Sequence, residues 1–148
     1  GGATRPITYG YRLFIASEDQ SIYGFFIVTA DRIWRHRTGA PIRTTPLLLD
    51  EVLYVGTSSD GLLALDPNDG SVKWSIPSLG AVTPLGMVGD TLLVRHGEVV
   101  STVDPSRGDI VEQARVPGLR DLVIGEVEGD SSVYGVTDAG QVVRFSPR

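Results

Sequence analysis

An internal repeat constrains this chain more than any other feature, because residues 4–37 align with residues 44–77 at an offset of 40 positions. Trp34 aligns with Trp74, and the segment Leu13-Phe14-Ile15 aligns with Leu53-Tyr54-Val55. The repeated unit consists of short runs rich in β-branched and aromatic residues, separated by turn-forming residues. We therefore expect each unit to form a small sheet of short strands.

The clearest unit predicts four strands, at Pro46–Leu49, Val52–Thr57, Leu62–Asp66 and Ser71–Ile76. A period of about 40 residues made only of strands and turns is typical of a β-propeller blade. The sequence thus predicts an all-β fold of about four blades, each with four antiparallel strands. The fourth unit is expected to start near Leu122 and to lack its last strand. We expect one propeller segment over residues 1–148, with blades at about 4–43, 44–81, 82–119 and 120–148.

A blade cannot bury both of its apolar faces by itself, so blades must stack on further blades. Three arrangements satisfy this requirement. The chain could be a piece of a longer propeller, one half of a ring that a second copy completes, or a small ring of four blades. We favour the first of these.

Composition excludes several classes of protein. With 41% hydrophobic and 21% charged residues, the chain is globular and not disordered. Its net charge of −5 gives no general attraction for nucleic acid or anionic membranes. The absence of cysteine excludes disulfides, thiolate metal sites and cysteine nucleophiles. No apolar run approaches the roughly 18–20 residues that a membrane-spanning helix needs.

The segment Gly61-Leu62-Leu63-Ala64-Leu65-Asp66, followed by Gly70-Ser71-Val72-Lys73-Trp74, resembles the PQQ-type β-propeller repeat. The resemblance covers nearly the whole chain, although Glu112 replaces the tryptophan in the third unit. It implies that Trp34 and Trp74 pack across to the neighbouring blade and dock it. Families with this repeat include quinoprotein alcohol dehydrogenases, BamB-type outer-membrane assembly proteins and extracellular sensor domains of bacterial kinases.

The motifs that could carry chemistry are incomplete. Asp66–Gly70 is similar to a calcium loop, but its second aspartate comes one residue early and a turn is the better interpretation. Gly56–Asp60 lacks the final glycine of a nucleophile elbow. His36 and His96 have no metal-ligand spacing around them. We therefore predict no catalytic residue, no cofactor and no metal site.

One basic cluster stands out, and it consists of Arg32, Arg35, His36, Arg37 and Arg43. It could be a docking patch for an acidic partner or a phosphate. It could also be the solvated outer strand of a blade, where charged side chains prevent aggregation. The sequence alone favours the second interpretation.

The missing catalytic motifs favour a non-catalytic scaffold that binds a protein partner. The resemblance implies that it acts in bacterial cell-envelope assembly, on the periplasmic or extracellular side. The candidate interaction loops are Ser58–Gly61, His96–Glu98 and Asp138–Gly140, with Ser58, Asp60, His96 and Asp138 as candidate residues. Neither a nucleic acid nor a membrane span is expected, whereas a homodimer or a missing remainder of the propeller is possible. Two alternatives stay open, namely a fragment of a PQQ-dependent quinoprotein dehydrogenase and an extracellular ligand-sensing domain.

Overall fold

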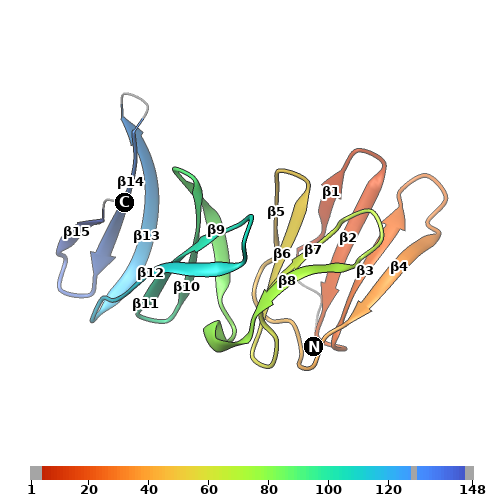
Figure 1. The fold of residues 1–148 in the computed structure, drawn as a ribbon, viewed down its shortest axis with the longest axis horizontal. Helices are drawn as coiled ribbons and strands as arrows, with labels where there is room; N and C mark the ends of the chain where they lie inside the picture. Colours follow the sequence, from red (N-terminus) through yellow and green to blue (C-terminus); the bar gives the residue numbers. More distant parts are fainter. Residues whose placement is uncertain (1–4, 128–129, 146–148) are drawn as a thin grey trace. The chain divides into compact units, whose positions relative to one another are not determined.

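The chain folds into four antiparallel sheets (Figure 1), and the computed structural model describes residues 5–127 and 130–145. In each sheet the strands follow one another in chain order, so every connection is a short turn between neighbours. Each sheet is referred to below as a blade. Blade 1 contains β1 (Ile7–Tyr9), β2 (Arg12–Ser17), β3 (Ser21–Phe26) and β4 (Arg32–Arg37), and blade 2 contains β5 (Leu47–Leu49), β6 (Val52–Thr57), β7 (Gly61–Leu65) and β8 (Val72–Ile76).

Blade 3 also has four strands, and blade 4 has three among the described residues. A short 3₁₀ turn, η1 (Pro77–Leu79), follows blade 2. The strands of blades 3 and 4 are β9 (Thr83–Val88), β10 (Thr91–His96), β11 (Val99–Asp104), β12 (Asp109–Arg115), β13 (Leu119–Val127), β14 (Asp130–Thr137) and β15 (Val142–Phe145). The fourth blade thus has three strands within the described residues, and the first of them starts at Leu119.

The chain divides into two compact units, residues 1–84 and residues 85–148, and each is described by itself. Blades 1 and 2 form the first unit. Their shared core consists of side chains from both sheets, and it is completed by Ile42 from the segment between them. The buried members of this core are Phe14, Ala16, Ile22, Trp34, Ile42, Leu53, Val55, Leu63 and Leu65.

Cross-strand pairing explains which residues enter this core. In blade 2, Leu53 pairs with Leu65 and Val55 with Leu63, so all four side chains lie on one face. The residues between them on β6 and β7 are buried as well, which means that both faces of blade 2 are covered. In blade 1 burial alternates along β2, because one face packs on blade 2 and the other stays half-buried.

The turn chemistry follows the sequence closely. Asp50 and Glu51 both have positive φ angles, 48° and 61°, as a tight two-residue hairpin turn requires. Between β7 and β8, the Asp66 carboxylate accepts the Asn68 N–H at 2.8 Å, and Asp69 accepts the Ser71 N–H at 2.9 Å. These carboxylates therefore stabilise their own turn, which is the ordinary use of aspartate at such positions.

In the second unit, the core joins β9, β10 and β11 of blade 3 to β13 and β14 of blade 4. Its buried members are Val88, Leu93, Val100, Val116, Leu119 and Val133. The outer strand β12 is exposed along its whole length and carries Glu112 where blade 2 has its tryptophan. In blades 1, 2 and 3, a bulge interrupts the pairing of the third strand with the fourth. The register shifts between Gly24 and Phe25 in blade 1, between Ala64 and Leu65 in blade 2, and between Thr102 and Val103 in blade 3.

Candidate protein-interaction site

Trp34 connects two blades of the first unit. Its indole N–H donates a hydrogen bond of 2.9 Å to the carbonyl oxygen of Pro67, in the turn between β7 and β8. The ring stacks on Phe14 with centroids 5.8 Å apart, and only 7% of the residue is exposed. The turn leaves room for the ring because position 70 is a glycine, and a Cβ there would overlap the indole.

Trp74 lies on β8 at the equivalent position and is half-buried. Its ring is tilted against Tyr54 of the same blade, with centroids 6.0 Å apart. Burial is the main cause that raises the pKa of the Tyr54 hydroxyl, and the negative charge of Asp50 raises it further. The blade-docking roles of Trp34 and Trp74 stay predictions that substitution can test.

Ser58 and Asp60 lie in the turn between β6 and β7, but they differ in what they contact. Ser58 is exposed. The Asp60 carboxylate accepts hydrogen bonds from the Gly39 N–H at 2.8 Å, the Thr57 hydroxyl at 2.9 Å and the Ser59 hydroxyl at 3.1 Å. Gly39 belongs to the segment that connects blade 1 to blade 2, so Asp60 fastens this turn to the connection.

These contacts set the pKa of Asp60. Burial acts to raise the pKa, but the hydrogen bonds from Gly39, Thr57 and Ser59 lower it, and a positive charge on His36 would lower it further. The net result is a pKa below the ordinary aspartate value. Asp60 therefore stays a carboxylate at neutral pH, which is the form that accepts these bonds best.

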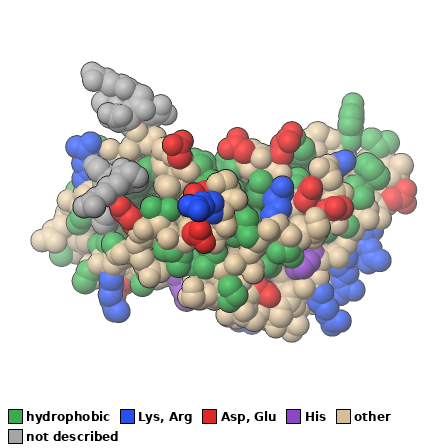
Figure 2. Space-filling model, viewed as in Figure 1, with side chains coloured by type: hydrophobic (Ala, Val, Ile, Leu, Met, Phe, Trp, Pro, Cys, Tyr) green, Lys and Arg blue, Asp and Glu red, His purple; other side chains and the backbone are tan. Residues whose placement is uncertain are grey.

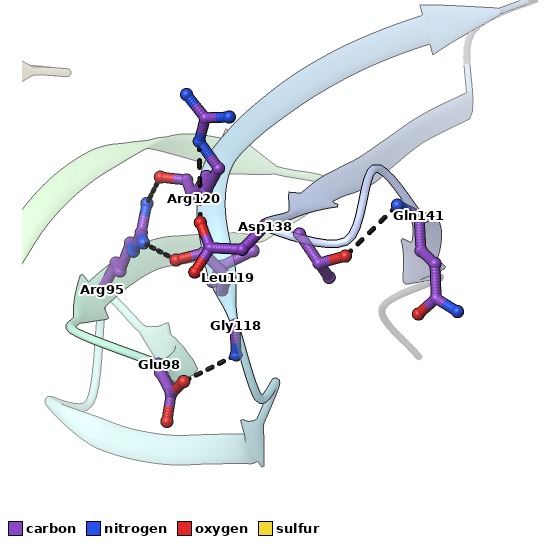
Figure 3. A network of polar contacts seen from close by, with 8 residues as sticks. Arg95, Glu98, Gly118, Leu119, Arg120, Asp138 and Gln141 are labelled. Carbon is purple, nitrogen blue, oxygen red and sulfur yellow. Dashed lines mark hydrogen bonds and ion pairs between the residues drawn. The ribbon is translucent and has the colours of Figure 1, made fainter.

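His96 ends β10 and is exposed, and the residues on either side of its turn are held in place. Arg95 donates to three backbone carbonyls: from Nε to Gly97 at 2.8 Å, and from its two terminal nitrogens to Arg120 and Leu119, both at 2.7 Å. Figure 3 shows this guanidinium reaching the start of β13. The turn that carries His96 is thus fastened to the next blade.

Glu98 makes the second contact of this turn. Its carboxylate accepts the Gly118 N–H at 2.6 Å and a guanidinium N–H of Arg115 at 3.1 Å (Figure 3). The hydrogen bond from Gly118 is the largest cause that lowers the pKa of Glu98, and Arg115 lowers it as well. Glu98 and Arg95 together hold residues 118–120 from two sides.

Asp138 lies in the turn between β14 and β15. Its backbone N–H donates to the Gly118 carbonyl at 2.7 Å, and its carboxylate lies 3.7 Å from the Nε of Arg120. Both side chains of this ion pair are largely exposed, at 75% and 63%. The turns that carry His96 and Asp138 therefore converge on the segment 118–120 (Figure 3).

The predicted residues thus form two groups, one in each compact unit. Ser58 and Asp60 share a turn beside the first connection between blades, and His96 and Asp138 flank the connection from blade 3 to blade 4. Sequence reasoning missed Arg95 and Gly118, and it included Glu98 only as the end of the candidate loop His96–Glu98. The available signal was a pair of opposite charges on either side of His96-Gly97, next to a turn.

No three His, Asp or Glu side chains in the described part of the chain come together as metal ligands, and the acids at the turns already accept N–H and O–H groups. None of the helices among residues 5–127 and 130–145 has the length and apolarity to cross a bilayer. The arrangement presents exposed side chains, such as Ser58 and His96, on turns that side-chain hydrogen bonds fasten to neighbouring segments.

In comparisons with known proteins, the chain matches the model of one protein family over nearly its whole length. The family model described as "Outer membrane protein assembly factor BamB" matches residues 1–146. Among curated relatives, the BamB protein of Moranella endobia is 27% identical over 78% of the chain, and that of Yersinia pestis is 24% identical over the whole chain. The chain spans only 31% and 41% of these two relatives.

Solved structures share the fold. BamB from Moraxella catarrhalis superposes with a TM-score of 0.69 at 21% identity, and the match covers 96% of this chain and 42% of that one. The computationally designed protein Ika4 gives a TM-score of 0.77 at 14% identity, over all of this chain and 92% of that one. The designed protein Ika8 gives 0.74 at 14% identity over 98% of this chain and 46% of that one. The predicted all-β fold of propeller blades and the resemblance to the PQQ-type repeat family are thereby confirmed.

Proposed function

The chain belongs to the family of the outer membrane protein assembly factor BamB, and from this premise we propose that it is a non-catalytic scaffold that holds a protein partner during the assembly of outer membrane proteins. Membership in this family also confirms the predicted location in the bacterial envelope.

One observation carries the proposal: the turns between the second and third strands are anchored by side chains, while small groups at their tips stay exposed. Asp60 fastens the first of these turns to Gly39, and Arg95 and Glu98 fasten another to residues 118–120. Ordering a loop before binding reduces the entropy lost in the complex. Rigid turns with free tips are therefore suited to protein recognition.

The candidate residues have two different proposed roles, which are to contact the partner and to hold a turn in position. Ser58 and His96 are exposed and are the proposed contact residues. Asp60 accepts three hydrogen bonds, so its proposed role is to position the turn that carries Ser58. Asp138 combines both roles, because its N–H binds Gly118 while its exposed carboxylate faces solvent beside Arg120.

Site-specific photo-crosslinking in cells that produce the protein tests the proposal. A photoreactive residue at position 58 or 96 should form a crosslink with a component of the outer membrane assembly machinery, and Ser58→Glu or His96→Glu should weaken the complex without lowering Tm. The matched control is a photoreactive residue at position 73, on the exposed outer strand β8. Equal crosslinking at positions 58, 73 and 96 would contradict a specific role for the turns.

The quinoprotein alternative has a direct test as well. If the chain is a scaffold, adding PQQ and Ca²⁺ produces neither a quinone absorption band on the protein nor alcohol-dependent dye reduction. A protein-bound chromophore with turnover would replace the proposal with the enzyme hypothesis. A small-molecule thermal-shift screen addresses the ligand-sensing hypothesis in the same preparation.

A further inference from the structure

The outer strand of blade 1 is unusually basic. β4 carries Arg32, Arg35, His36 and Arg37, in a chain whose net charge is −5. Figure 2 shows Lys and Arg side chains gathered over the part of the molecule where Figure 1 draws β4. The corresponding strand β8 carries one lysine, and β12 carries Arg115 together with the acidic Asp109 and Glu112. Strong positive charge is therefore a property of this blade and not of outer strands in general.

The three arginines point to one face of the strand. In the register with β3, Arg32 lies opposite Phe25, Arg35 opposite Tyr23 and Arg37 opposite Ser21, and these positions share one side of the sheet. Arg35 is fixed, because its Nε donates to the Ser21 hydroxyl at 2.9 Å and its guanidinium lies 5.4 Å from the Tyr23 ring centroid. The side chains of Arg32 and Arg37 are exposed and form no hydrogen bond or ion pair with the described residues.

β4 also offers a backbone edge. It is the last strand in the order of its sheet, so among the described residues its only strand partner is β3. An open edge of this kind can accept an extended peptide as a further strand. In such a pairing, alternate side chains of the peptide would lie on the same side of the sheet as the three arginines.

An apolar patch adjoins the beginning of β4. The turn between β1 and β2 and the turn between β3 and β4 are joined by a 2.8 Å hydrogen bond from the Ile27 N–H to the Tyr11 carbonyl. Val28 is 79% exposed, Tyr11 77% and Ile27 46%. An exposed apolar cluster next to a charged strand is typical of a recognition surface.

The equivalent turn of blade 2, between β7 and β8, receives a tryptophan ring from the neighbouring blade. There, Gly70 leaves the space into which the Trp34 ring packs. In blade 1 the position is Ala30, whose φ of 60° keeps the same backbone conformation, so a methyl group stands where the indole would need to lie. This turn therefore cannot receive a tryptophan in the same way, and its apolar residues remain available to another ligand.

We infer that β4 and the adjoining turn bind an acidic, extended segment of a partner protein. The segment pairs antiparallel with the free edge of β4, places carboxylates at alternate positions opposite Arg32, Arg35 and Arg37, and ends in apolar residues that cover Ile27 and Val28. The antiparallel direction is chosen because antiparallel pairs are the more frequent kind and because it continues the pattern of this sheet. The inference extends the proposed scaffold function to a surface other than the turns at Ser58 and His96.

Fluorescence anisotropy with a labelled synthetic peptide tests the inference. The probe alternates glutamate and valine and ends in Leu-Phe, and the comparison peptide has the same composition with its glutamates in one block. We expect the alternating peptide to bind roughly tenfold more tightly, because only it can direct its carboxylates to one side of a strand. Added salt should weaken its binding. Equal affinity of the two peptides would overturn the inference, because it would show charge attraction without strand pairing.

Protein variants locate the binding surface. The double variant Arg32→Glu/Arg37→Glu should weaken binding about tenfold or more, since two attractions become repulsions. Val28→Ser should weaken it by a smaller factor, and circular dichroism should show that both variants remain folded. The matched control Lys73→Glu, on the outer strand of blade 2, should leave affinity unchanged. An unchanged affinity in the double variant would overturn the inference.

Peptide binding to β4 and crosslinking at positions 58 and 96 test different surfaces, so either can fail without the other. Ser58→Glu and His96→Glu should bind the alternating peptide as the unsubstituted chain does, because they lie on other turns. If the peptide fails to bind while the crosslinks at positions 58 and 96 persist, the basic strand is not a docking site and the scaffold proposal stands. If the crosslinks fail while the peptide binds, the basic strand is a docking site and the proposed role of the turns at Ser58 and His96 is wrong.

Discussion

At the scale of single residues, Trp34 shows how a repeat position acquires a specific environment. Its ring is accommodated by two glycines, because a Cβ at Gly24 would lie 2.5 Å from its Nε1 and a Cβ at Gly70 would overlap its six-membered ring. Its N–H finds an acceptor in the Pro67 carbonyl. A buried indole with a satisfied N–H and close packing contributes strongly to stability.

Gly70→Ala is therefore expected to destabilise the first unit. Its φ of 75° is unfavourable for alanine and the new methyl group would displace the Trp34 ring, so we expect a loss of about 2–4 kcal/mol of unfolding free energy. Urea denaturation followed by tryptophan fluorescence measures the change. The control is Gly10→Ala, which has a φ of 58° and no atom within 4 Å of its Cβ, and should cost only about 1–2 kcal/mol. Equal losses in the two variants would mean that the Trp34 contact contributes nothing.

Asp60→Asn tests the anchoring of the first turn through its pH dependence. The pKa of Asp60 is lowered in the folded protein, so the carboxylate stabilises the fold above the ordinary aspartate pKa, and this contribution is lost as the pH falls through the folded value. We expect the variant to be less stable by about 1 kcal/mol at neutral pH. The gap should close in acid.

Chemical denaturation of both proteins across this pH range gives the comparison. Asp90→Asn is the control, because Asp90 lies exposed in the turn between β9 and β10 and its side chain forms no hydrogen bond or ion pair with the described residues. A gap for Asp60→Asn that stays constant from neutral to acidic pH would argue against a role for the charge.

Sequence predicts some of these residues better than others. The equivalence of Trp34 and Trp74 is visible because a tryptophan is rare and recurs at a fixed offset. The acceptor of the Trp34 N–H is a backbone carbonyl, and no side chain marks it in the sequence. Asp60 looks like an ordinary turn aspartate, and only the folded chain brings Gly39 from 21 positions away to its carboxylate.

At the scale of elements, the turn between β10 and β11 is bound to the start of β13 by Arg95 and Glu98. These contacts connect blades 3 and 4 through polar groups. In the core, Leu119 and Val133 of blade 4 pack with apolar residues of blade 3. The two kinds of contact differ in solvent access. The polar ones are therefore expected to control local opening of the turn more than global unfolding.

Arg95→Ala is expected to loosen the start of β13. Loss of the bonds to the Leu119 and Arg120 carbonyls should reduce stability by about 1–2 kcal/mol. It should also speed exchange of the Gly118 amide, which donates to the neighbouring Glu98. Hydrogen exchange measured by NMR gives the residue-level answer. Arg120→Ala removes only an exposed ion pair and should cost about 0.5 kcal/mol or less, so a larger effect in this control would contradict the assignment.

The strands were predicted well where turn residues separate apolar runs, as in blade 2. At the start of blade 4, the polar residues Arg120 and Asp121 give no sign in the sequence that they belong to a strand. In the structure β13 starts at Leu119, and a register shift between Leu119 and Asp121 lets the chain absorb the polar pair within the strand. The bulges of blades 1 to 3 could not be predicted either, since they depend on the pairing of two strands.

At the scale of the whole molecule, the repeat indicates where another blade could pack. The face of blade 2 formed by Leu53, Val55, Leu63 and Leu65 is covered by blade 1. Its equivalent in blade 1, 40 positions earlier, consists of Leu13, Ile15, Tyr23 and Phe25, which are only half-buried. Arg35 lies against the Tyr23 ring on this face, and the apolar surface that remains half-buried favours association with a further sheet.

We therefore expect the isolated chain to associate with itself through this face. Light scattering should give a mass of at least twice 15.9 kDa for the unsubstituted chain. Phe25→Glu should shift the mass to that of a monomer, whereas Val111→Glu, which adds a charge on the exposed strand β12, should leave it unchanged. A monomeric unsubstituted chain would contradict this expectation.

The placement of the two tryptophans has a practical consequence for optical experiments. Both belong to residues 1–84, so emission excited at the red edge of protein absorption comes entirely from that compact unit. Residues 85–148 are dark under the same illumination. The native chain thus reports on one of its units without any attached dye, and a single engineered tryptophan in the other would make both visible in turn.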